Sequence, residues 1–497
     1  MLSLTLFPAH SLEAIPTEMR KAKIVCTIGP ASRSPAILAQ LIAQGMDVAR
    51  LNFSHGTHES HAAAIAAIRQ AAAQHGTAVA IIQDLQGPRI RVGLLPPEGI
   101  AVTAGQTLRL RTSSTTPSTP PTSMAAMPEI PITYAQLTHD LRVGARILIN
   151  DGLIELLADR ISDDFVDCSV LTGGTITSQK GVNLPGTTVT VPTLTEKDRD
   201  DLRFGVEQGV DYVALSFVRA PQDIQTARTL LSEYGSQVPI IAKIERAEAI
   251  ASLDGILDQA DGVMIARGDL GVEMGPEAVP VLQKRIIAEA NRRRRLVITA
   301  TQMLESMTQS SRPTRAEASD VANAVFDGTD AVMLSAETAA GAYPIETVQV
   351  MDRIIRAAEN EGGLGFHLKR QTDLEHLTIP EAMCVAAASA ARVTGAQAIL
   401  AFTERGVTGR LVSKQRPAAP IIAFTVGEAV RRQMALYWGV RSFVLPEIAQ
   451  TDARLHAAEQ LLQSHNLIRQ GDRIVIVSGT HTAKPGGTNL IQLHELT

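Results

Sequence analysis

Cysteines, membrane-length apolar runs and a leader-like start are scarce or absent in this sequence. The three cysteines, Cys26, Cys168 and Cys384, lie far apart in no metal-like spacing. This argues against a disulfide framework and for a reducing compartment. No apolar run approaches the roughly 20 residues that cross a membrane, and residues 1–16 lack a basic region and contain Glu13, so we expect no signal peptide. These absences predict a cytoplasmic protein without a membrane partner.

An excess of basic residues is absent too. Lys and Arg number 46 against 51 Asp and Glu, which gives a net charge of −5, so we expect no nucleic-acid partner. The run Arg292–Arg295 is the exception, and it follows a helical pattern whose C-terminus favours cations. Hydrophobic residues make up 45% of the chain and charged residues 20%, which is typical of a globular protein with ample core.

Strand-like and helical segments alternate along much of the chain. Before residue 88, β-rich runs occupy 23–28, 46–53 and 78–84, with helical patterns at 34–44 and 59–75 between them. After Pro192, five more β-rich runs follow, at 212–217, 239–243, 263–266, 296–299 and 331–334. Eight such runs separated by helices favour a closed (β/α)8 TIM barrel over an open doubly wound sheet.

The predicted fold is therefore α/β, with two further units attached to the barrel. Residues between Gly87-Pro88 and Leu184–Gly186 form short alternating β runs without a long helix, and they contain a low-complexity segment, 112–123, typical of a flexible loop. A glycine-rich boundary at 361–365 precedes a further α/β pattern with strands at 398–402, 421–424 and 473–477. The predicted division is an N-terminal extension at 1–19, a barrel at 20–87 and 186–357, an inserted β-rich unit at 88–185, and a C-terminal α/β domain at 358–497.

Polar and charged residues gather just after the predicted barrel strands, where the loops of a barrel converge on a site. They are Arg50, Asn52, Ser54, Asp84, Ser216, Lys243, Glu245, Asp269, Thr301, Ser335 and Glu337. Lys243 and Glu245 lie two apart on one strand face, and the spacing to Asp269 suits one crossover between neighbouring parallel strands. Two carboxylates are what Mg²⁺ usually takes from a protein. The alternative is a buried Lys–Glu ion pair with a turn aspartate, and the position at a barrel mouth favours the metal site.

Two glycine-bearing loops, 403–410 and 484–489, occur in the C-terminal part. Their amides, hydroxyls and cations can nest an anion. Two ordinary surface loops remain an equal alternative.

Several motifs, in one order and one set of spacings, resemble the pyruvate kinase family. They are Ala49–Gly56 (ARLNFSHG), Lys180–Gly186 (KGVNLPG), Ala242–Glu245 (AKIE), Ala266–Gly271 (ARGDLG), and Ala300–Met307 (ATQMLESM) followed by Pro313–Glu317 (PTRAE). The resemblance extends from Arg20 to the C-terminus. It implies a phosphotransferase that makes pyruvate and ATP from phosphoenolpyruvate and ADP in the last step of glycolysis. It also implies that the inserted unit at 88–185 is a β-barrel-like lid, that the C-terminal domain is regulatory, and that the protein is a homotetramer.

The resemblance also implies a role for each matching residue. Glu245 and Asp269 match the ligands of Mg²⁺ (or Mn²⁺), and Lys243 matches the residue that stabilises the transferring phosphoryl group. Arg50 matches a phosphate contact, while the Gly268 and Asp269 amides with Thr301 match the pocket for the substrate carboxylate. Thr301, with Ser335 and Glu337 nearby, matches the proton relay to the enolate. The implied nucleotide contacts are Asn52, His55, Arg91 and Lys180.

One departure concerns the monovalent cation. Potassium-dependent members read Asp-Thr-Lys-Gly-Pro-Glu where this chain reads Asp84-Leu-Gln-Gly-Pro-Arg89. Asn52, Ser54, Asp84 and the Leu85 carbonyl form the candidate cation site. Two cations 4 Å apart repel by about 4 kcal/mol at intermediate dielectric. We therefore expect Arg89 to replace K⁺ and the enzyme to work without it.

A second departure lies in the C-terminal loop, where Arg405 occupies a position at which effector loops of the family often carry Ser. The candidate contacts for a phosphorylated metabolite effector are Thr403, Arg405, Thr408 and Arg410. Two other functions remain in view. A metal-dependent barrel lyase or aldolase would not explain the lid, and an inactive metabolite sensor would not need an intact set of Arg50, Lys243, Glu245, Asp269 and Thr301.

Overall fold

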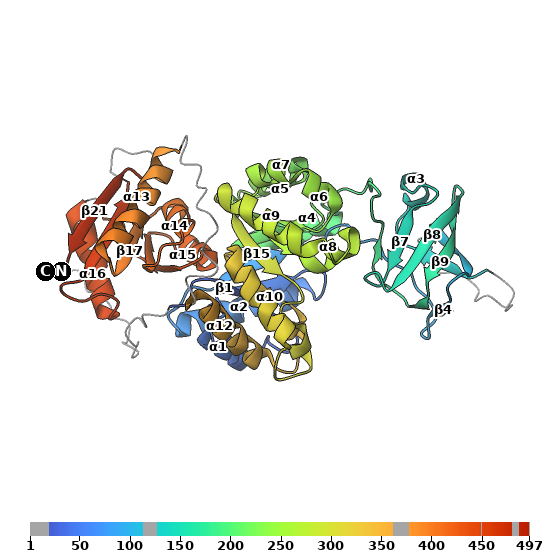
Figure 1. The fold of residues 1–497 in the computed structure, drawn as a ribbon, viewed down its shortest axis with the longest axis horizontal. Helices are drawn as coiled ribbons and strands as arrows, with labels where there is room; N and C mark the ends of the chain where they lie inside the picture. Colours follow the sequence, from blue (N-terminus) through green and yellow to red (C-terminus); the bar gives the residue numbers. More distant parts are fainter. Residues whose placement is uncertain (1–18, 113–126, 361–376, 449, 480–486, 497) are drawn as a thin grey trace.

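Three units lie in a row along the long axis of the molecule: the C-terminal α/β unit, a central barrel, and a β-rich unit (Figure 1). The computed structural model describes residues 19–112, 127–360, 377–448, 450–479 and 487–496. Nearly all of the predicted N-terminal extension, most of the predicted 112–123 loop and the predicted 361–365 boundary lie outside these ranges. So does the first half of the 484–489 loop.

The central unit is a closed barrel of eight parallel strands, in the order β1-β16-β15-β14-β13-β12-β3-β2. The prediction of a (β/α)8 barrel is confirmed. Its strands are β1 (Lys23–Thr27), β2 (Val48–Asn52), β3 (Ala80–Asp84), β12 (Tyr212–Leu215), β13 (Ile240–Ile244), β14 (Gly262–Ala266), β15 (Leu296–Ala300) and β16 (Ala331–Leu334). Its larger helices are α1 (Pro35–Ala43), α2 (His58–Gln74), α4 (Glu196–Glu207), α5 (Pro221–Glu233), α9 (Val279–Arg292), α10 (Arg315–Asp327) and α12 (Pro344–Asn360). Shorter ones are α6 (Ala247–Ala251), α7 (Leu253–Gln259), α8 (Arg267–Met274), the 3₁₀ turn η1 (Glu305–Thr308) and α11 (Ala336–Ala339).

Local sequence sets where these helices begin. Thr57, Thr195 and Thr314 each accept a hydrogen bond from the backbone N–H three residues on, and the side chain there bonds back to the cap. Such a capping box satisfies two of the amides that the first turn of a helix leaves unpaired. Proline at the first position of α1 and α5 acts in the same direction.

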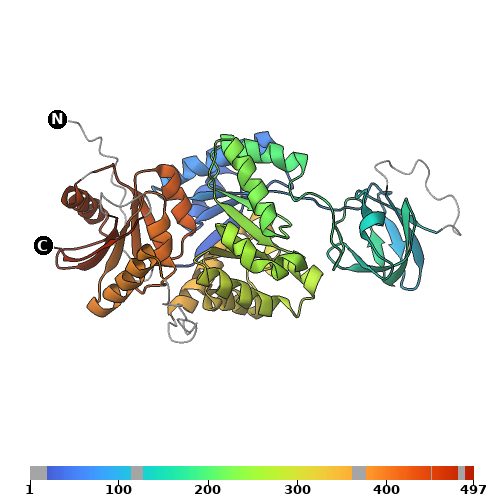
Figure 2. The same ribbon diagram turned by 90° about the horizontal axis from the view of Figure 1, so that it is seen from above.

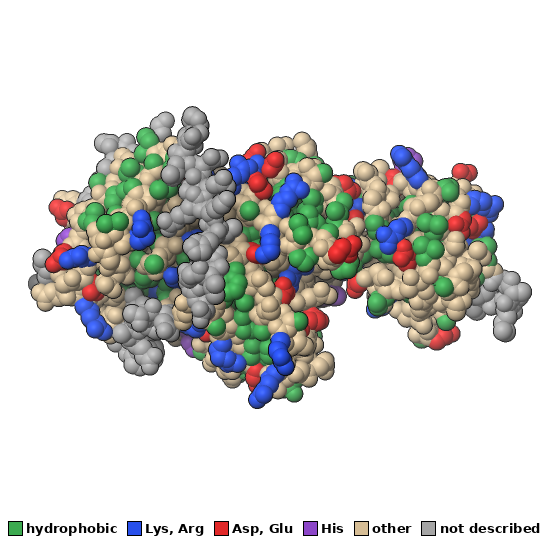
Figure 3. Space-filling model, in the orientation of Figure 1, with side chains coloured by type: hydrophobic (Ala, Val, Ile, Leu, Met, Phe, Trp, Pro, Cys, Tyr) green, Lys and Arg blue, Asp and Glu red, His purple; other side chains and the backbone are tan. Residues whose placement is uncertain are grey.

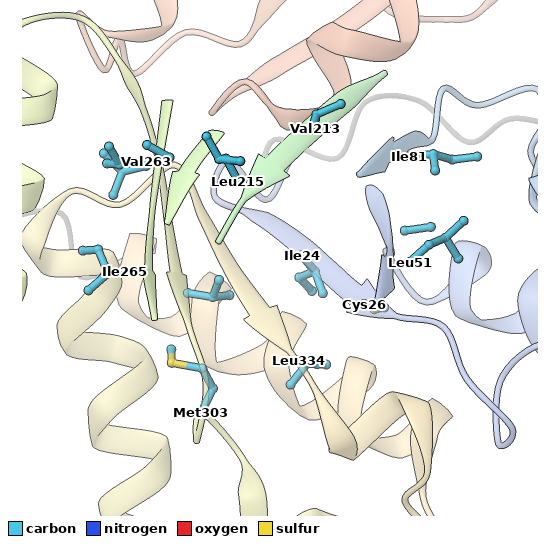
Figure 4. Packing of buried hydrophobic residues seen from close by; sticks show 14 of the residues in the cluster. Ile24, Cys26, Leu51, Ile81, Val213, Leu215, Val263, Ile265, Met303 and Leu334 are labelled. Atoms are coloured by element: carbon cyan, nitrogen blue, oxygen red, sulfur yellow. The ribbon is translucent and has the colours of Figure 1, made fainter. Parts of the chain in front are cut away.

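Barrel strands bury both faces, in two separate layers. Ile24, Cys26, Leu51 and Ile81 point outward and pack with the helices, as part of this layer in Figure 4 shows. Their neighbours Val25, Val48, Ala80 and Ile82 belong to the inner layer. That alternation is the two-residue period of a strand. The inner layer continues into Met434, Tyr437 and Val440 of the C-terminal unit, so this unit closes the N-terminal end of the barrel.

An aspartate directly precedes every second barrel strand. Each accepts a backbone N–H from the strand before: Ile24 N to Asp47 at 2.8 Å, Ile81 N to Asp211 at 2.8 Å, Ile240 N to Asp261 at 2.9 Å, and Val297 N to Asp330 at 2.7 Å. Each also pairs with a cation. These four bonds fasten the end of the barrel opposite the predicted site.

Two of the four aspartates also hold the C-terminal unit. Asp330, fully buried, pairs with Lys414 at 2.5 Å and Arg416 at 2.9 Å. Asp211 pairs with Arg432 at 2.9 Å. The side chain of Trp438 lies at the same junction, with the Arg416 guanidinium 4.7 Å from its ring centroid. The junction is therefore both apolar and ionic.

The inserted unit is a half-barrel joined to the central barrel by two adjacent connections (Figure 2). A six-stranded mixed sheet has the order β11-β7-β8-β9-β5-β6, and β4 pairs with β10. Its elements are β4 (Ile100–Val102), β5 (Thr107–Thr112), β6 (Glu129–Ile132), α3 (Leu137–Asp140), β7 (Arg146–Ile149), β8 (Ile154–Ile161), β9 (Phe165–Thr172), β10 (Gly174–Ile176) and β11 (Val182–Asn183). Where the chain leaves the barrel, Gly87 N donates to Asp198 Oδ1 of the returning α4 at 3.0 Å. The insertion therefore begins and ends at one place.

The C-terminal unit has a five-stranded sheet in the order β19-β18-β17-β20-β21, parallel except for β21. Its elements are α13 (Ile379–Thr394), β17 (Ala398–Phe402), α14 (Val407–Ser413), β18 (Ile421–Thr425), α15 (Glu428–Gln433), η2 (Met434–Leu436), β19 (Val440–Val444), α16 (Thr451–Ser464), β20 (Arg473–Ser478) and β21 (Leu490–Glu495). On the face drawn in Figure 3, acidic and basic side chains are interspersed over all three units. Among the described residues, no helix is long and apolar enough to cross a membrane.

Candidate active site

The side chains predicted to form a site meet at the carboxyl ends of β2, β3, β12 and β13. Arg50 Nε donates to Asp84 Oδ2 at 2.6 Å, and Lys243 Nζ donates to Ser216 Oγ at 2.7 Å. Lys243 Nζ also lies 3.2 Å from Asp84 Oδ1 and 2.9 Å from Glu245 Oε1. Asp84 and Glu245 are both 1% exposed. These contacts form one buried network of alternating charges.

Lys243 remains protonated in this network. Burial disfavours the ammonium, but the carboxylates of Asp84 and Glu245 outweigh it and hold the pKa of Lys243 above its ordinary value. Burial likewise disfavours the Asp84 carboxylate, yet Lys243 and Arg50 hold its pKa below the usual range. A fixed positive charge therefore stands at the barrel mouth across the pH range near neutrality.

The predicted metal ligands come from neighbouring strand ends. Glu245 follows β13, and its Oε2 accepts a hydrogen bond from Phe217 N at 2.8 Å, while Asp269 lies in the first turn of α8, directly after β14. Burial raises the pKa of Glu245, and repulsion from Asp269 raises it further. Two carboxylates close enough to repel each other suit a divalent cation. The described residues contain no group of three or more His, Cys, Asp or Glu arranged for a metal. A divalent ion held by Glu245 and Asp269 would also use water and substrate oxygens.

Thr301 is held in a strained conformation beside Asp269. Its φ is 65° and that of Gln302 is 55°, and positive φ is an outlier for a β-branched residue. Its Oγ1 accepts from Gly268 N at 2.9 Å, which ties it to α8. Such strain persists where surrounding structure enforces it, typically at functional sites.

Ser335 and Glu337 brace the neighbouring loops. Glu337, fully buried, accepts from the backbone amides of Leu304 at 3.2 Å and Ser335 at 2.6 Å, and Ser335 Oγ is buried without a hydrogen bond among the described residues. The expected proton relay through these two side chains to Thr301 stays a prediction.

The predicted nucleotide residues line the approach between barrel and insertion. Arg91 Nη1 donates to Gln179 O at 2.9 Å. The backbone of Arg91 also forms an antiparallel β-bridge with Gly181, next to the exposed Lys180. His55 lies across from them. Burial lowers its pKa, and the charges of Arg89, Arg91 and Arg50 lower it further. Asn52 Oδ1 accepts from Ser54 N at 3.1 Å. The charges of Arg89 and Arg91 from the insertion and of Arg50 from the barrel therefore act on the same imidazole.

Comparison with known proteins identifies the family. A family model described as pyruvate kinase, barrel domain, matches residues 19–348, and one described as pyruvate kinase, alpha/beta domain, matches residues 381–494. The chain belongs to the pyruvate kinase family. It is a phosphotransferase that transfers the phosphoryl group of phosphoenolpyruvate to ADP in glycolysis, in a family that generally uses a divalent metal.

Individual relatives agree with this assignment. The pyruvate kinase of Geobacillus stearothermophilus is 46% identical over 482 residues, which cover 96% of this chain and 81% of the relative. That of Corynebacterium glutamicum is 42% identical over 479 residues, covering 96% and 98%. A solved structure of a pyruvate kinase from Cryptosporidium parvum superposes with a TM-score of 0.88 at 39% identity, and covers 98% of each chain.

Arg89 does not contact the candidate cation site of this pyruvate kinase. It is exposed, and its side chain forms no hydrogen bond or ion pair with the residues that the structure describes. Asp84 is engaged by Arg50 and Lys243, and Leu85 O accepts from Ser216 Oγ at 2.7 Å. Arg89 instead borders a cavity of about 50 Å³ between lid and barrel, together with Asp269. Its charge acts from the edge of the site.

The predicted effector residues occupy two surroundings. Thr408 Oγ1 lies 2.7 Å from Thr488 Oγ1, which brings the two glycine-bearing loops together. Thr403 N donates to Phe424 O at 2.9 Å, and Arg405 is exposed. Arg410 faces the barrel junction, because its charge acts on the phenols of Tyr212 and Tyr437.

Sequence reasoning missed two arginines that reach toward the lid. Arg219 Nη2 donates to Val191 O at 2.8 Å, and Arg246 Nη2 donates to Thr187 O at 3.1 Å. Both carbonyls belong to the segment that returns from the lid. The only available signal was the position of each arginine directly after a site-bearing strand.

Proposed function

We propose that Lys243, Glu245 and Asp269 form the phosphoryl-transfer centre of this pyruvate kinase, with Arg50 and Thr301 binding phosphoenolpyruvate. The observation that supports it best is Lys243 Nζ, which lies 2.9 Å from Glu245 and 3.2 Å from Asp84 in a buried site. Glu245 and Asp269 hold Mg²⁺ or Mn²⁺. A bound divalent ion supplies charge that polarises and orients phosphoryl oxygens.

The residues of the chain then act by position and charge. The Lys243 ammonium faces the phosphoryl group in flight, and Arg50 binds the same group as a planar, permanent cation. The amides of Gly268 and Asp269, with the Thr301 hydroxyl, bind the substrate carboxylate, and Thr301 takes part in proton delivery to the enolate. Asn52, His55, Arg91 and Lys180 bind the nucleotide, and closure of the lid excludes water.

Substitution of Lys243 tests this assignment. Lys243→Met should lower kcat for ATP formation from phosphoenolpyruvate and ADP by about 10²–10³-fold, by analogy with loss of one oxyanion donor. The matched control is Lys284→Met, which removes a 60% exposed lysine of the outer helix α9 that pairs with Asp327, and it should keep wild-type activity. Equal activity in both variants would refute the role of Lys243. Absence of ATP formation in the wild type would instead favour the lyase or the sensor.

We also propose that this enzyme needs no K⁺. Arg89 supplies a permanent positive charge at the lid edge, and the Asp84 carboxylate already has two cationic partners. Wild type should be fully active in a buffer free of K⁺ and NH₄⁺, and Arg89→Glu should become activated by KCl. Full wild-type activity only after addition of KCl would overturn the proposal.

The remaining proposals concern assembly and regulation. The enzyme is a cytoplasmic homotetramer with the domain boundaries predicted above, and a phosphorylated metabolite binds at Thr403, Arg405 and Thr408. Arg410, which faces the barrel junction, is left out of this site. The contact between Thr408 and Thr488 supports a shared loop site. Sedimentation measures the assembly. A phosphoenolpyruvate saturation curve that saturating sugar phosphates and nucleotides leave unmoved would refute the effector site.

A further inference from the structure

Arg246 occupies a buried position between three parts of the site. It directly follows Glu245, one proposed metal ligand. Its Nη1 lies 2.9 Å from Glu273 Oε1, and Glu273 is one turn beyond Asp269 on α8. Its Nη2 donates to Thr187 O at 3.1 Å, just past the point where the lid returns to the barrel. The side chains of Arg246 and Glu273 are 7% and 0% exposed.

The Arg246–Glu273 pair joins the two segments that carry the metal ligands. Residues four apart share one face of a helix, so a force on Glu273 is transmitted to Asp269. On the other side, Arg246 and Glu245 are adjacent in the chain. Without a cation, the carboxylates of Glu245 and Asp269 repel each other. The ion pair opposes that repulsion and fixes the separation of the two ligands.

Within the described part of the chain, Glu273 has no strong contact other than Arg246. Its two carboxylate oxygens are buried and form no hydrogen bond with the described residues, so the charge of Arg246 is its main partner. A buried ion pair with so few further bonds contributes little net stability. A role in geometry accounts for it better than a role in folding.

A second arginine extends the connection to the lid. Arg219 follows Ser216 and Phe217, which bond to Lys243 and Glu245 respectively. It donates to Val189 O, to Val191 O at 2.8 Å and to Thr193 Oγ1 at 3.2 Å. Arg219 and Arg246 therefore both bind the segment that returns from the lid, and both are close in the chain to residues of the site.

We propose that Arg246 is a positioning residue that sets the separation of the metal ligands Glu245 and Asp269 through Glu273, and links them to the lid through Thr187. The inference rests on the metal site proposed above. Two consequences are separable. The charge of Arg246 sets the affinity for the divalent ion. The two-pronged shape of its guanidinium, which bonds Glu273 and Thr187 at once, sets the affinity of the lid for the nucleotide.

The first consequence, the effect of the Arg246 charge on metal affinity, is tested by titrating the enzyme with Mn²⁺ at pH 8 without substrates. The EPR signal of the free ion measures how much Mn²⁺ is bound. Arg246→Gln should weaken Mn²⁺ binding by about 10–100-fold, as is usual for groups that orient metal ligands. Glu273→Gln should act in the same direction, and the double variant should be no weaker than Arg246→Gln, because the two residues act as one unit. Arg228→Gln is the control, since Arg228 likewise bonds a carboxylate, Asp261 at 2.9 Å, and a carbonyl, Gln259 O at 3.0 Å, at the far end of the barrel.

Arg246→Lys separates the two consequences. Lysine keeps the charge but not the planar, two-pronged geometry of the guanidinium. Arg246→Gln should raise the KM for ADP, because it loses the bond to Thr187 O beside the lid. Arg246→Lys should raise this KM as well but bind Mn²⁺ nearly as wild type. Mn²⁺ affinity that is unchanged in Arg246→Gln, or reduced equally in Arg228→Gln or in Arg246→Lys, would overturn the proposal. A wild type that binds no Mn²⁺ would refute the metal site itself.

Discussion

Replacing Asp330 by Asn should detach the C-terminal unit from the barrel well before either unfolds. The amide keeps the shape of the carboxylate and can still accept from Val297 N, but it removes the negative charge between Lys414 and Arg416. Those side chains are 1% and 14% exposed, so both lose their carboxylate partner while buried and keep only neutral hydrogen-bond partners among the described residues, Asn291 Oδ1 and Gly328 O. Breaking a buried ion pair in this way costs about 3–5 kcal/mol.

Trp438 provides the assay, because it is the only tryptophan in the chain and lies at this junction, 2% exposed. With a urea dependence of roughly 2 kcal/mol per molar, the midpoint of its fluorescence transition should fall by about 1.5–2.5 M. Glu428→Gln is the control, because Glu428 pairs with Arg431 on α15 in a partly exposed ion pair. An Asp330→Asn midpoint within 0.3 M (about the error of such a fit) of the control would refute the reasoning.

Three further predictions concern the thiols, Glu273 and Arg91. Burial raises the pKa of Cys168 and Cys384 to about 12 and that of Cys26 further, so a thiol reagent at pH 8 should label the protein only after unfolding, and rapid labelling of the native enzyme would contradict this. Burial also raises the pKa of Glu273 from 4.5 to about 7. Glu273 therefore ionises at a lower pH in the unfolded chain than in the folded protein. As the pH rises from 4.5 to 7, the free energy of unfolding of wild type should fall by about 3 kcal/mol relative to that of Glu273→Gln. Parallel curves of unfolding free energy against pH for the two proteins would contradict this. Arg91→Ala should raise the KM for ADP more than that for phosphoenolpyruvate, whereas Arg160→Ala, an exposed lid arginine paired with Asp167, should change neither.

The barrel was predictable because its strands are buried on both faces. Such strands read as short apolar runs bounded by turn residues, and all eight lie within two residues or so of their predicted ranges. In the C-terminal unit, the pattern failed for β19 and β21. These are the two edge strands of their sheet, and polar residues such as the partly buried Arg441 and the exposed Gln492 interrupt their apolar pattern.

The charged centre was predictable for a different reason. Lys243 and Glu245 share one strand, and Asp269 follows the next strand, so connectivity alone brings them together. Glu273 and Arg246 had no such signal, because their contact depends on how α8 turns back over the end of β13. The left-handed backbone of Thr301 is likewise a property of the folded loop. For Arg89, the resemblance implied a charge beside the cation site, but Arg89 is exposed after the Gly87-Pro88 turn and forms no ion pair with Asp84.

The position of the lid has a consequence for the order in which the chain folds. The neighbouring strands β3 and β12 end and begin at Asp84 and Tyr212, so the sheet closes only across the whole insertion. A long unfolded segment would make that step slow, since a non-local contact forms only after its loop is closed. If the lid folds first, its two ends already lie together, as the bond from Val92 N to Lys180 O at 2.8 Å indicates. The inserted unit thereby shortens the conformational search that completes the barrel, and we expect substitutions that damage its hydrophobic core to slow refolding as well as catalysis.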